Sequence, residues 1–344
     1  MLRTLPVVVL SFLAVTPVIA GALDAAAIND AAMPAKPASS DKPSSSIVKL
    51  QILLDRAHFS PGEIDGKLGE NAQKALSAFA EENELNLDKA ITPDLWDKLA
   101  LTSDGPAIVD YKIMEVDLRG PFLKKLPAKM EDMKSLEALS YTSPLEALAE
   151  KFHMSEALLS AINPGKAFDK AGETIAVANV IGQQNSIPVA RVEIDKARQT
   201  LKAFDASGKL LTFYPATVGS PEKPTPSGTL KVTAINENPT YRYNPDYRFK
   251  GVKSRKPFTI EPGPNNPVGS TWINLSAEGY GIHGTPDPGK VSKSTSHGCI
   301  RLTNWDALAL SANIKRGTPV VFLDRPGEAI APAQNRPLAK SSRM

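Results

Sequence analysis

The 344-residue chain has little of what several protein classes depend on. It contains one cysteine, four histidines and 6% aromatic residues, and its 40 basic residues nearly balance its 37 acidic ones. One cysteine cannot form an internal disulfide, and a net charge of +3 is too small to indicate a nucleic-acid-binding protein. Beyond the N-terminal segment, no stretch is apolar enough to span a membrane. The sequence therefore excludes a disulfide-stapled fold and leaves one thiol to be explained.

The N-terminal segment has the pattern of a signal peptide. A basic head at Arg3 precedes an apolar run from Leu5 to Ile19, and the small residues Ala20 and Ala22 follow. This run is shorter than the roughly 20 residues that a membrane span needs, so cleavage is expected rather than anchoring. We expect residues 1–22 to be a signal peptide and the protein to be exported. The periplasm is the expected compartment, because no sorting motif or lipid-modified cysteine is present.

Composition and periodicity divide the remainder of the chain. Residues 23–46 are rich in Ala, Pro, Ser and Lys and predict a flexible linker. Residues 47–101 predict three short helices around a glycine-rich turn. A connector over 102–186 contains two short helices and a strand within about 141–180. Short strand candidates with one helix fill 187–324, and 325–344 is expected to be disordered.

The helical unit at 47–101 resembles the small three-helix peptidoglycan-binding domain. The residues that carry this resemblance are Leu50, Gln51, Leu54, Pro61, Gly62, Ile64, Asp65, Gly66, Gly69, Ala75, Leu76 and Phe79. The chain departs from that family at Ala80, where glutamine is usual. A small helical spacer with ordinary turn glycines is the alternative interpretation.

The connector resembles a degenerate LysM module, which is another glycan-binding fold. The matching residues are Leu148, Ala149, Phe152, Leu158, Asn163, Pro164, Gly172 and Ile175. The usual opening GDT of that module is missing. A structural connector without affinity for glycan is the alternative.

The one cysteine has unusual neighbours. Cys299 lies in SKSTSHGCIRL, two residues after His297 and two before Arg301, and His283 lies upstream in GYGIHGTPDP. A thiol becomes a strong nucleophile as thiolate, and either histidine can accept its proton near neutral pH. In an extended backbone, His297 and Cys299 share one face, whereas His283 reaches the thiol only through tertiary structure.

Two further features fit acyl chemistry. Gly298 allows close approach of the backbone to a substrate, and the amides of Gly298 and Cys299 are candidate donors to an oxyanion. Arg301 is a natural clamp for a carboxylate. Three alternatives remain: a buried inert thiol, a zinc site formed by His283, His297, Cys299 and Asp287, and a redox role, which is disfavoured because no second cysteine can resolve it.

IHGT followed by STSHGCIRL resembles the signature of the L,D-transpeptidase catalytic domain, also called the YkuD-type domain, which crosslinks bacterial peptidoglycan. TPSG at 225–228 and NPVG at 266–269 support this resemblance, which covers about 187–323. It implies that Cys299 is the nucleophile, that His283 is the base, and that the Gly284 carbonyl orients His283. The implied oxyanion and substrate-binding residues are Gly298, His297, Ser296 and Arg301.

The resemblance implies a multidomain α+β protein. Its catalytic domain would be mainly β and sandwich-like, preceded by the small three-helix peptidoglycan-binding domain. The implied reaction is attack of Cys299 on a stem tetrapeptide, loss of D-alanine, and transfer of the acyl group to an amine to give a 3→3 crosslink. Peptidoglycan is then the partner, and neither a metal nor an organic cofactor is required. The alternatives are a hydrolase acting through the same acyl-enzyme and a non-catalytic wall-binding protein.

The segment 241–256 mixes aromatic and basic residues. Arg242, Arg248 and Lys250 are placed to meet the carboxylates of a donor peptide if this segment is a mobile lid. An exposed, solvated loop is the plain alternative, and nucleic-acid binding is disfavoured by the expected compartment.

Overall fold

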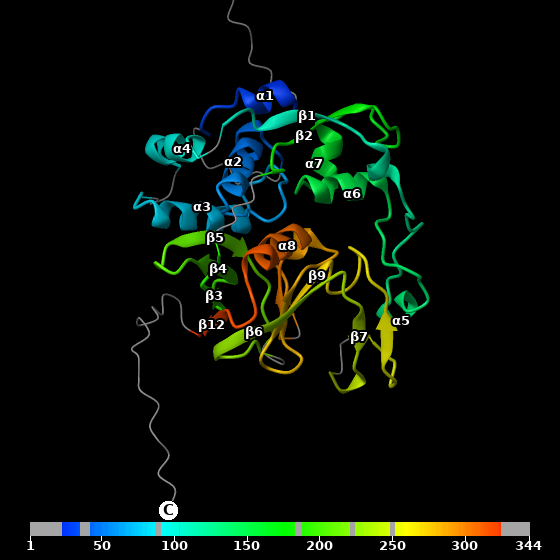
Figure 1. Ribbon diagram of the computed structural model, residues 1–344. Helices are drawn as coiled ribbons and strands as arrows, with labels where there is room; N and C mark the ends of the chain where they lie inside the picture. Colours follow the sequence, from blue (N-terminus) through cyan, green and yellow to red (C-terminus); the bar gives the residue numbers. More distant parts are fainter. Residues whose placement is uncertain are drawn as a thin grey trace, which may run out of the picture.

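The computed structural model describes residues 23–34, 42–86, 91–102, 104–182, 188–220, 224–247, 252–296 and 298–324. The predicted signal peptide and C-terminal tail therefore lie outside the described residues. The order of elements along the chain places helical units first and a large sheet last (Figure 1). Among the described residues, no helix has both the length and the apolar character needed to cross a membrane.

Seven of the eight α-helices among the described residues lie in the first half of the chain, and α8 lies near its end. The α-helices are α1 (Ala25–Asn29), α2 (Ser45–Arg56), α3 (Glu70–Glu82), α4 (Pro93–Ala100), α5 (Met130–Met133), α6 (Pro144–Lys151), α7 (Glu156–Ala161) and α8 (Asn304–Asn313). Short 3-10 helices are η1 (Glu115–Leu118), η2 (Pro245–Tyr247) and η3 (Pro288–Lys290). Ser44 accepts from Ile47 N and Thr92 from Leu95 N, so α2 and α4 each begin with a side-chain cap.

The second half forms an eight-stranded sheet with the order β11-β10-β9-β6-β12-β3-β4-β5. Its strands are β3 (Arg191–Asp195), β4 (Thr200–Phe204), β5 (Leu210–Pro215), β6 (Gly228–Glu237), β9 (Thr271–Leu275), β10 (Gly281–His283), β11 (Ile300–Arg301) and β12 (Pro319–Leu323). Two small sheets pair β1 (Ile108–Lys112) with β2 (Thr174–Ala178), and β7 (Tyr241–Tyr243) with β8 (Phe258–Ile260).

The long strand β6 joins the two parts of the large sheet. Its first residues pair with β12 and its later residues pair with β9. The register shifts between Val232 and Ala234, and such an irregularity bends a strand and increases its twist. The prediction of an α+β protein with a mainly-β catalytic domain is confirmed, with the strands continuing through one curled sheet.

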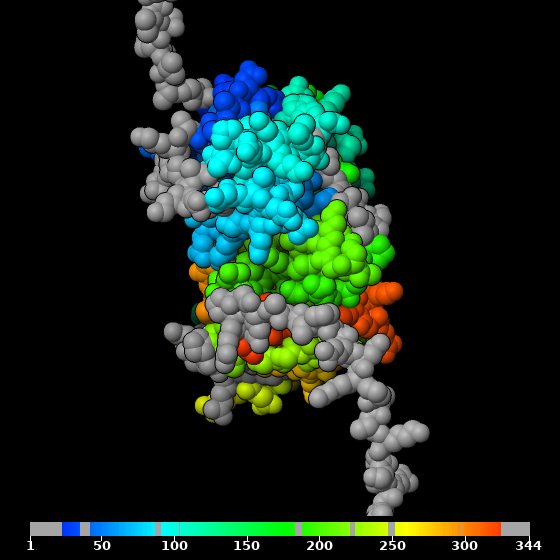
Figure 2. Space-filling model, turned by 90° about the vertical axis from the view of Figure 1, so that its left-hand side faces the viewer, coloured from blue at the N-terminus to red at the C-terminus, as the bar shows by residue number. Residues whose placement is uncertain are grey.

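The helical unit of α2, α3 and α4 packs directly on this sheet. Leu210 and Phe213 of β5 belong to the same apolar cluster as the buried faces of these helices. Ser60 N donates to Phe213 O at 2.9 Å, and Phe213 N donates to His58 O at 2.9 Å. In the space-filling view, the blue and cyan helices lie against the green strands without a gap (Figure 2). This unit is therefore packed against the eight-stranded sheet.

Part of the segment expected to be a flexible linker is ordered. Asp24 caps α1, and Ile28 is fully buried in an apolar cluster formed mostly by residues 107–180, which we call the middle unit. Asn29 exchanges two hydrogen bonds with the backbone of Ile108, at 2.8 and 3.0 Å. The expectation of a flexible linker is wrong for residues 23–34, because one buried isoleucine and one asparagine tie this segment to β1. Residues 35–41 lie outside the described residues.

Three parts of the chain meet beside α8. His153, which follows α6, forms an ion pair with Asp55 at 3.0 Å and stacks on Trp305 with ring centroids 5.1 Å apart. Ser60 donates to the buried carboxylate of Asp306 at 3.0 Å. Burial, reinforced by the nearby Asp55 charge, raises the pKa of Asp306 to about 7. The upstream units are thus joined to the catalytic domain by buried polar contacts as well as by apolar packing.

Candidate active site

A cavity of about 740 Å³ lies at the edge of the large sheet that carries β9, β10 and β11. Cys299, His283, Arg301 and Ser296 all line it. The structure therefore brings together four of the residues that the sequence singles out, although His283 is 16 positions before Cys299. His297 lies outside the described residues.

The strand register explains why these side chains meet. β10 pairs with β11 so that His283 lies opposite Arg301, and β10 pairs with β9 so that His283 lies opposite Trp272. Directly opposed residues present their side chains on one face of a sheet. Cys299 is two residues before Arg301 and immediately before β11. The strand pairing thus places the imidazole, the guanidinium and the thiol in one cavity.

His283 is buried and held in one orientation. Only 4% of it is exposed, and its ring stacks on Trp272 with centroids 5.3 Å apart. Its Nδ1 lies 2.6 Å from the carbonyl oxygen of Gly284. Because a carbonyl can only accept, Nδ1 carries the proton and Nε2 keeps the lone pair. This contact matches the role that the resemblance implies for Gly284.

The electrostatic environment keeps His283 neutral. Burial lowers its pKa to about 3, the neighbouring charge of Arg301 adds to the fall, and the hydrogen bond to Gly284 opposes it. At neutral pH the imidazole is therefore unprotonated and can accept a proton.

Arg301 provides a cation beside the thiol. Burial lowers the pKa of its guanidinium, while the Asp287 carboxylate and the thiolate form of Cys299 raise it. Its Nε is buried and has no hydrogen-bond partner among the described residues. A buried guanidinium N–H in a cavity is suited to an anionic group such as a carboxylate.

The turn that carries Cys299 is organised by Ser296. The Ser296 hydroxyl donates to Cys299 O at 2.5 Å and accepts from Gly298 N at 3.1 Å. The expectation that the Gly298 amide donates to an oxyanion is therefore not met in this arrangement, because Ser296 already occupies that N–H. The thiol itself donates to the carbonyl of Gly279 at 3.6 Å.

Gly298 meets two requirements of this turn. Its φ is +101°, a backbone conformation that L side chains rarely adopt, and an added Cβ would lie 2.8 Å from the ring of Tyr280. Its carbonyl accepts from the buried Thr225 hydroxyl at 3.0 Å. Thr225 begins the TPSG motif, so the structure gives this motif a role in holding the turn before Cys299.

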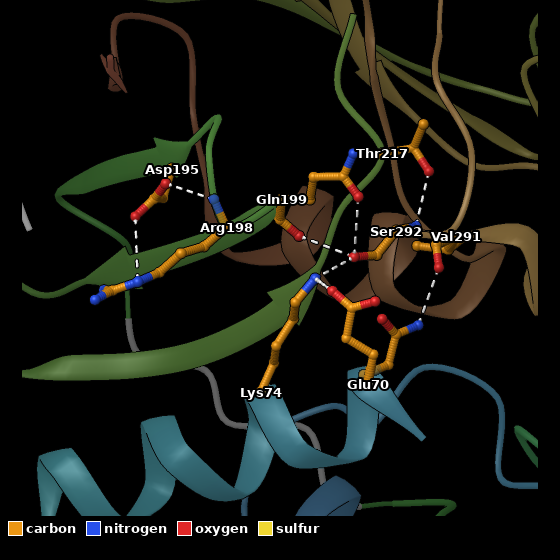
Figure 3. Close-up of polar contacts among 9 residues, drawn as sticks. Glu70, Lys74, Asp195, Arg198, Gln199, Thr217, Val291 and Ser292 are labelled. Carbon is orange, nitrogen blue, oxygen red and sulfur yellow. Dashed lines mark hydrogen bonds and ion pairs between the residues drawn. The ribbon is translucent and has the colours of Figure 1, made fainter. Parts of the chain in front are cut away.

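Helix α3 contacts the segment between His283 and Cys299 (Figure 3). Lys74 Nζ donates to the Ser292 hydroxyl at 2.8 Å, and Asn71 donates to Val291 O at 3.0 Å. From the other side, Ser292 N donates to Thr217 Oγ1 at 2.8 Å. Ser292 has a φ of +61°, which is uncommon for a serine. The upstream helical unit therefore helps to fix the segment that leads to the thiol.

The segment after β6 forms part of the opposite wall of the cavity. Tyr241, Arg242 and Val252 line it, and Arg242 is exposed. Arg248 and Lys250 lie outside the described residues, so the structure places only one of the three basic residues expected to face the donor peptide.

Asn304 and Trp272 belong to this site and were missed by the sequence analysis. Asn304 is buried at the start of α8, and its Oδ1 accepts from Ser270 N and Thr285 N, each at 3.1 Å. Its place two residues after SHGCIRL was the available signal. A Cβ at Gly284 would lie 2.1 Å from Asn304 Oδ1, and one at Gly269 would lie 1.9 Å from it. The NPVG turn and the HG dipeptide thus both pack against this amide.

Within the described residues, no group of three or more His, Cys, Asp or Glu side chains is arranged to hold a metal ion. The zinc hypothesis also required His297, which is not among those residues.

Comparisons with known proteins agree with this geometry. The model of the YkuD family, the L,D-transpeptidase catalytic domain, matches residues 190–322. The L,D-transpeptidase YkuD of Bacillus licheniformis is 30% identical over 178 residues, which are 51% of this chain and 91% of that protein. The L,D-transpeptidase YqjB of Bacillus subtilis is 33% identical over 147 residues, which are 41% of this chain and 76% of that protein.

Solved structures were compared as well. The crystal structure of L,D-transpeptidase 3 from Mycobacterium tuberculosis aligns with a TM-score of 0.33 and 18% identity, over 40% of this chain and 62% of that one. Both of these sequence relatives are at least 30% identical to this chain and are matched over three quarters or more of their length, which settles the family. The chain belongs to the YkuD family of L,D-transpeptidases.

Proposed function

We propose that this protein is an exported cysteine L,D-transpeptidase that acts on peptidoglycan stem tetrapeptides through a thioester on Cys299. The observation that carries this proposal is that Cys299 shares one cavity with a neutral, oriented histidine and a partly buried guanidinium. Family membership supplies the reaction class, and the cavity supplies the groups which that class needs.

The thiol is activated by transfer of its proton to Nε2 of His283. An imidazole with a pKa of about 3 is a weak base on its own. It becomes protonated as the thiolate forms, because the new negative charge stabilises the imidazolium. The guanidinium of Arg301 also stabilises the thiolate, and the hydrogen bond from Nδ1 to the Gly284 carbonyl leaves the lone pair on Nε2 to accept the proton.

Acylation then follows from this arrangement. Sγ attacks the carbonyl of the third stem residue, and the negative charge of the tetrahedral intermediate develops in a cavity lined by Arg301. The bond to the terminal D-alanine breaks, and the leaving amine takes the proton from His283. A thioester remains on Cys299.

Deacylation reverses the movement of the proton. An acceptor amine attacks the thioester, gives its proton to His283, and displaces the thiolate, which is reprotonated. An amine from a neighbouring stem gives a 3→3 crosslink, and water in its place gives a tripeptide.

Product analysis tests the proposal. The mature protein is incubated with a purified disaccharide tetrapeptide, beside a Cys299→Ala control, and the products are identified by mass spectrometry. A crosslinked dimer that lacks one D-alanine and is absent from the control supports transpeptidation. Tripeptide alone would move the assignment to a hydrolase, and the absence of any Cys299-dependent product would leave a wall-binding protein.

Replacing Arg301 with glutamine should shift the pH dependence of turnover. The guanidinium charge contributes to the low pKa of His283, so its removal raises that pKa. In the parent enzyme, His283 remains neutral down to a pH far below 6.5, and kcat/KM should not fall between pH 7 and pH 5 on its account. In Arg301→Gln, the acidic limb should move to higher pH, which a profile of kcat/KM from pH 4 to 8 measures.

The exposed Arg316 provides a matched control, because Arg316→Gln removes the same charge away from the cavity. An acidic limb that stays in place in Arg301→Gln would contradict the assignment of Arg301 as the cation that acts on His283.

Replacing Gly284 with alanine should lower activity strongly. The added methyl group would lie 2.1 Å from Asn304 Oδ1 and 3.2 Å from Asn304 Cα, so the backbone that orients His283 must move. A displacement of this kind costs about 10²-fold in rate and about 1–3 kcal/mol of stability. Gly289→Ala is a control, because its methyl group would meet only the carboxylate end of Glu63. Equal kcat/KM for Gly284→Ala and the parent would contradict the proposed role of this backbone.

Binding of the cell wall by the upstream units remains a prediction. Several residues behind the two resemblances have structural roles: buried Gln51 accepts from Gly66 N at 2.7 Å, and buried Asn163 exchanges hydrogen bonds with the backbone of Ala176 at 2.7 and 2.8 Å. Retention of a Cys299→Ala protein on purified sacculi would support the prediction that the upstream units bind the cell wall.

A further inference from the structure

A partly buried carboxylate of helix α6, that of Glu150, contacts the first residue of α8 beside the active site. Glu150, near the end of α6, accepts from Asn304 Nδ2 with both oxygens, at 3.0 and 3.1 Å. The two residues are 154 positions apart in the sequence. A contact between the middle unit and the first residue of α8 therefore lies next to the active-site backbone.

The two ends of the Asn304 side-chain amide have different hydrogen-bond partners. Its Nδ2 donates to Glu150 and to Pro264 O, and its Oδ1 accepts from Ser270 N and Thr285 N. The amide can satisfy all these partners in only one orientation, since a backbone N–H only donates and a carbonyl or carboxylate oxygen only accepts. Glu150 thereby helps to fix which end of the Asn304 amide faces the active site.

The other side of Asn304 touches the backbone that holds the base. Thr285 N is one residue beyond Gly284, whose carbonyl accepts from Nδ1 of His283 at 2.6 Å. A Cβ at Gly284 would collide with Asn304 Oδ1, so the two groups are in direct contact. Two residues thus connect Glu150 to the orientation of the imidazole.

Glu150 itself is well held. Tyr141 donates to it at 2.9 Å. Burial raises its pKa to about 7, while hydrogen bonds from Asn304 and Tyr141 and the charge of His153 oppose the rise and the charge of Glu146 adds to it. Withdrawing a carboxylate even partly from water is costly to a fold unless hydrogen bonds replace those of water, and Glu150 receives three of them.

We propose that Glu150 is a positioning residue for His283: through Asn304 it holds the Gly284–Thr285 backbone that orients the imidazole. This inference rests on the proposed function for the role of His283 as base. The middle unit then contributes to catalysis, because Glu150, which orients the side-chain amide of Asn304, lies on α6.

The test compares Glu150→Gln with the parent at pH 8, above the pKa of Glu150. The glutamine has nearly the same shape, but its NH₂ group can face Asn304 and favour a flip of that amide, which would bring donors against Ser270 N and Thr285 N. We expect kcat to fall about tenfold with KM unchanged, which is the cost of a small misplacement of a catalytic group. The rate at which iodoacetamide alkylates Cys299 should fall with it.

Glu156→Gln is the matched control, because it changes a carboxylate of the same unit at the exposed start of α7. Thermal unfolding followed by circular dichroism checks that each variant is folded. If Glu150→Gln does not fold, Tyr141→Phe replaces it. That variant removes one donor to the carboxylate and should lower kcat about two- to threefold with KM unchanged.

The results for these variants either support or contradict the role of Glu150 as a positioning residue. Unchanged kcat and unchanged alkylation in a folded Glu150→Gln protein would overturn it, and so would a fall of equal size in Glu156→Gln. If the parent yields no Cys299-dependent product, the proposed function fails, yet the alkylation rates still show whether Glu150 controls the reactivity of the thiol. The two failures are therefore distinguishable.

Discussion

Replacing Cys299 with alanine should abolish turnover of a stem tetrapeptide. The thioester requires a nucleophilic atom at this position, and alanine has none. Removal of a catalytic nucleophile lowers kcat by about 10⁴-fold or more, because the remaining groups bind the substrate but cannot be acylated. Release of D-alanine, measured by a coupled assay, should fall to the level of a reaction without enzyme.

The change should leave the fold intact. Cys299 is half-buried, its hydrogen bond to Gly279 O is long at 3.6 Å, and alanine fills less space than cysteine without a clash. We therefore expect a melting temperature close to that of the parent. Release of D-alanine at a tenth of the parent rate or more by folded Cys299→Ala protein would contradict the account.

Replacing His283 with glutamine should have the second largest effect. Glutamine can donate to the Gly284 carbonyl, but it has no basic nitrogen with which to accept the thiol proton. General-base catalysis contributes about 10²- to 10⁴-fold, and kcat/KM should fall by that amount. The residual rate should rise with pH up to the alkaline range, because hydroxide then takes over the deprotonation of the thiol.

His58→Asn is the matched control. His58 has a φ of +67°, a conformation that asparagine tolerates well, and it lies outside the cavity of Cys299. This variant should retain the parent kcat/KM. A folded His283→Gln protein with kcat/KM within a few fold of the parent would show that another group is the base.

The sequence was informative about local structure because its patterns are strong. The apolar spacing of Leu50 and Leu54 predicts α2, and the alternation through β3 matches its buried and half-buried residues. The strand β11 was missed because it has two residues, Ile300 and Arg301, and so short a strand has no period. Its pairing with β10 is nevertheless what places Arg301 beside His283.

Some active-site residues could likewise be predicted from the sequence, and others could not. Cys299, His283 and Arg301 were found because a thiol, an imidazole and a guanidinium that lie close together in a sequence are typical of nucleophilic catalysis. Glu150 carried no such signal, because one glutamate on a short amphipathic helix is ordinarily a surface residue. Its burial against Asn304 depends on how the middle unit packs on α8, and that packing is a long-range property.

The relation between the units also depends on packing. Two segments that the sequence analysis treats as separate modules contact residues before and after Cys299 in the chain. Helix α3 does so through Lys74 and Ser292, and α6 through Glu150 and Asn304. Deleting either unit should therefore change the catalytic domain itself, beyond any loss of wall binding.

If the acyl group passes through Cys299, mass spectrometry of the intact protein should detect it there. The protein is mixed with a stem tetrapeptide, quenched with acid within seconds, and weighed, and the modified peptide is then mapped. We predict a mass gain equal to the donor less D-alanine, located on Cys299 and absent from Cys299→Ala. Turnover without such an adduct, or an adduct on another residue, would contradict the account.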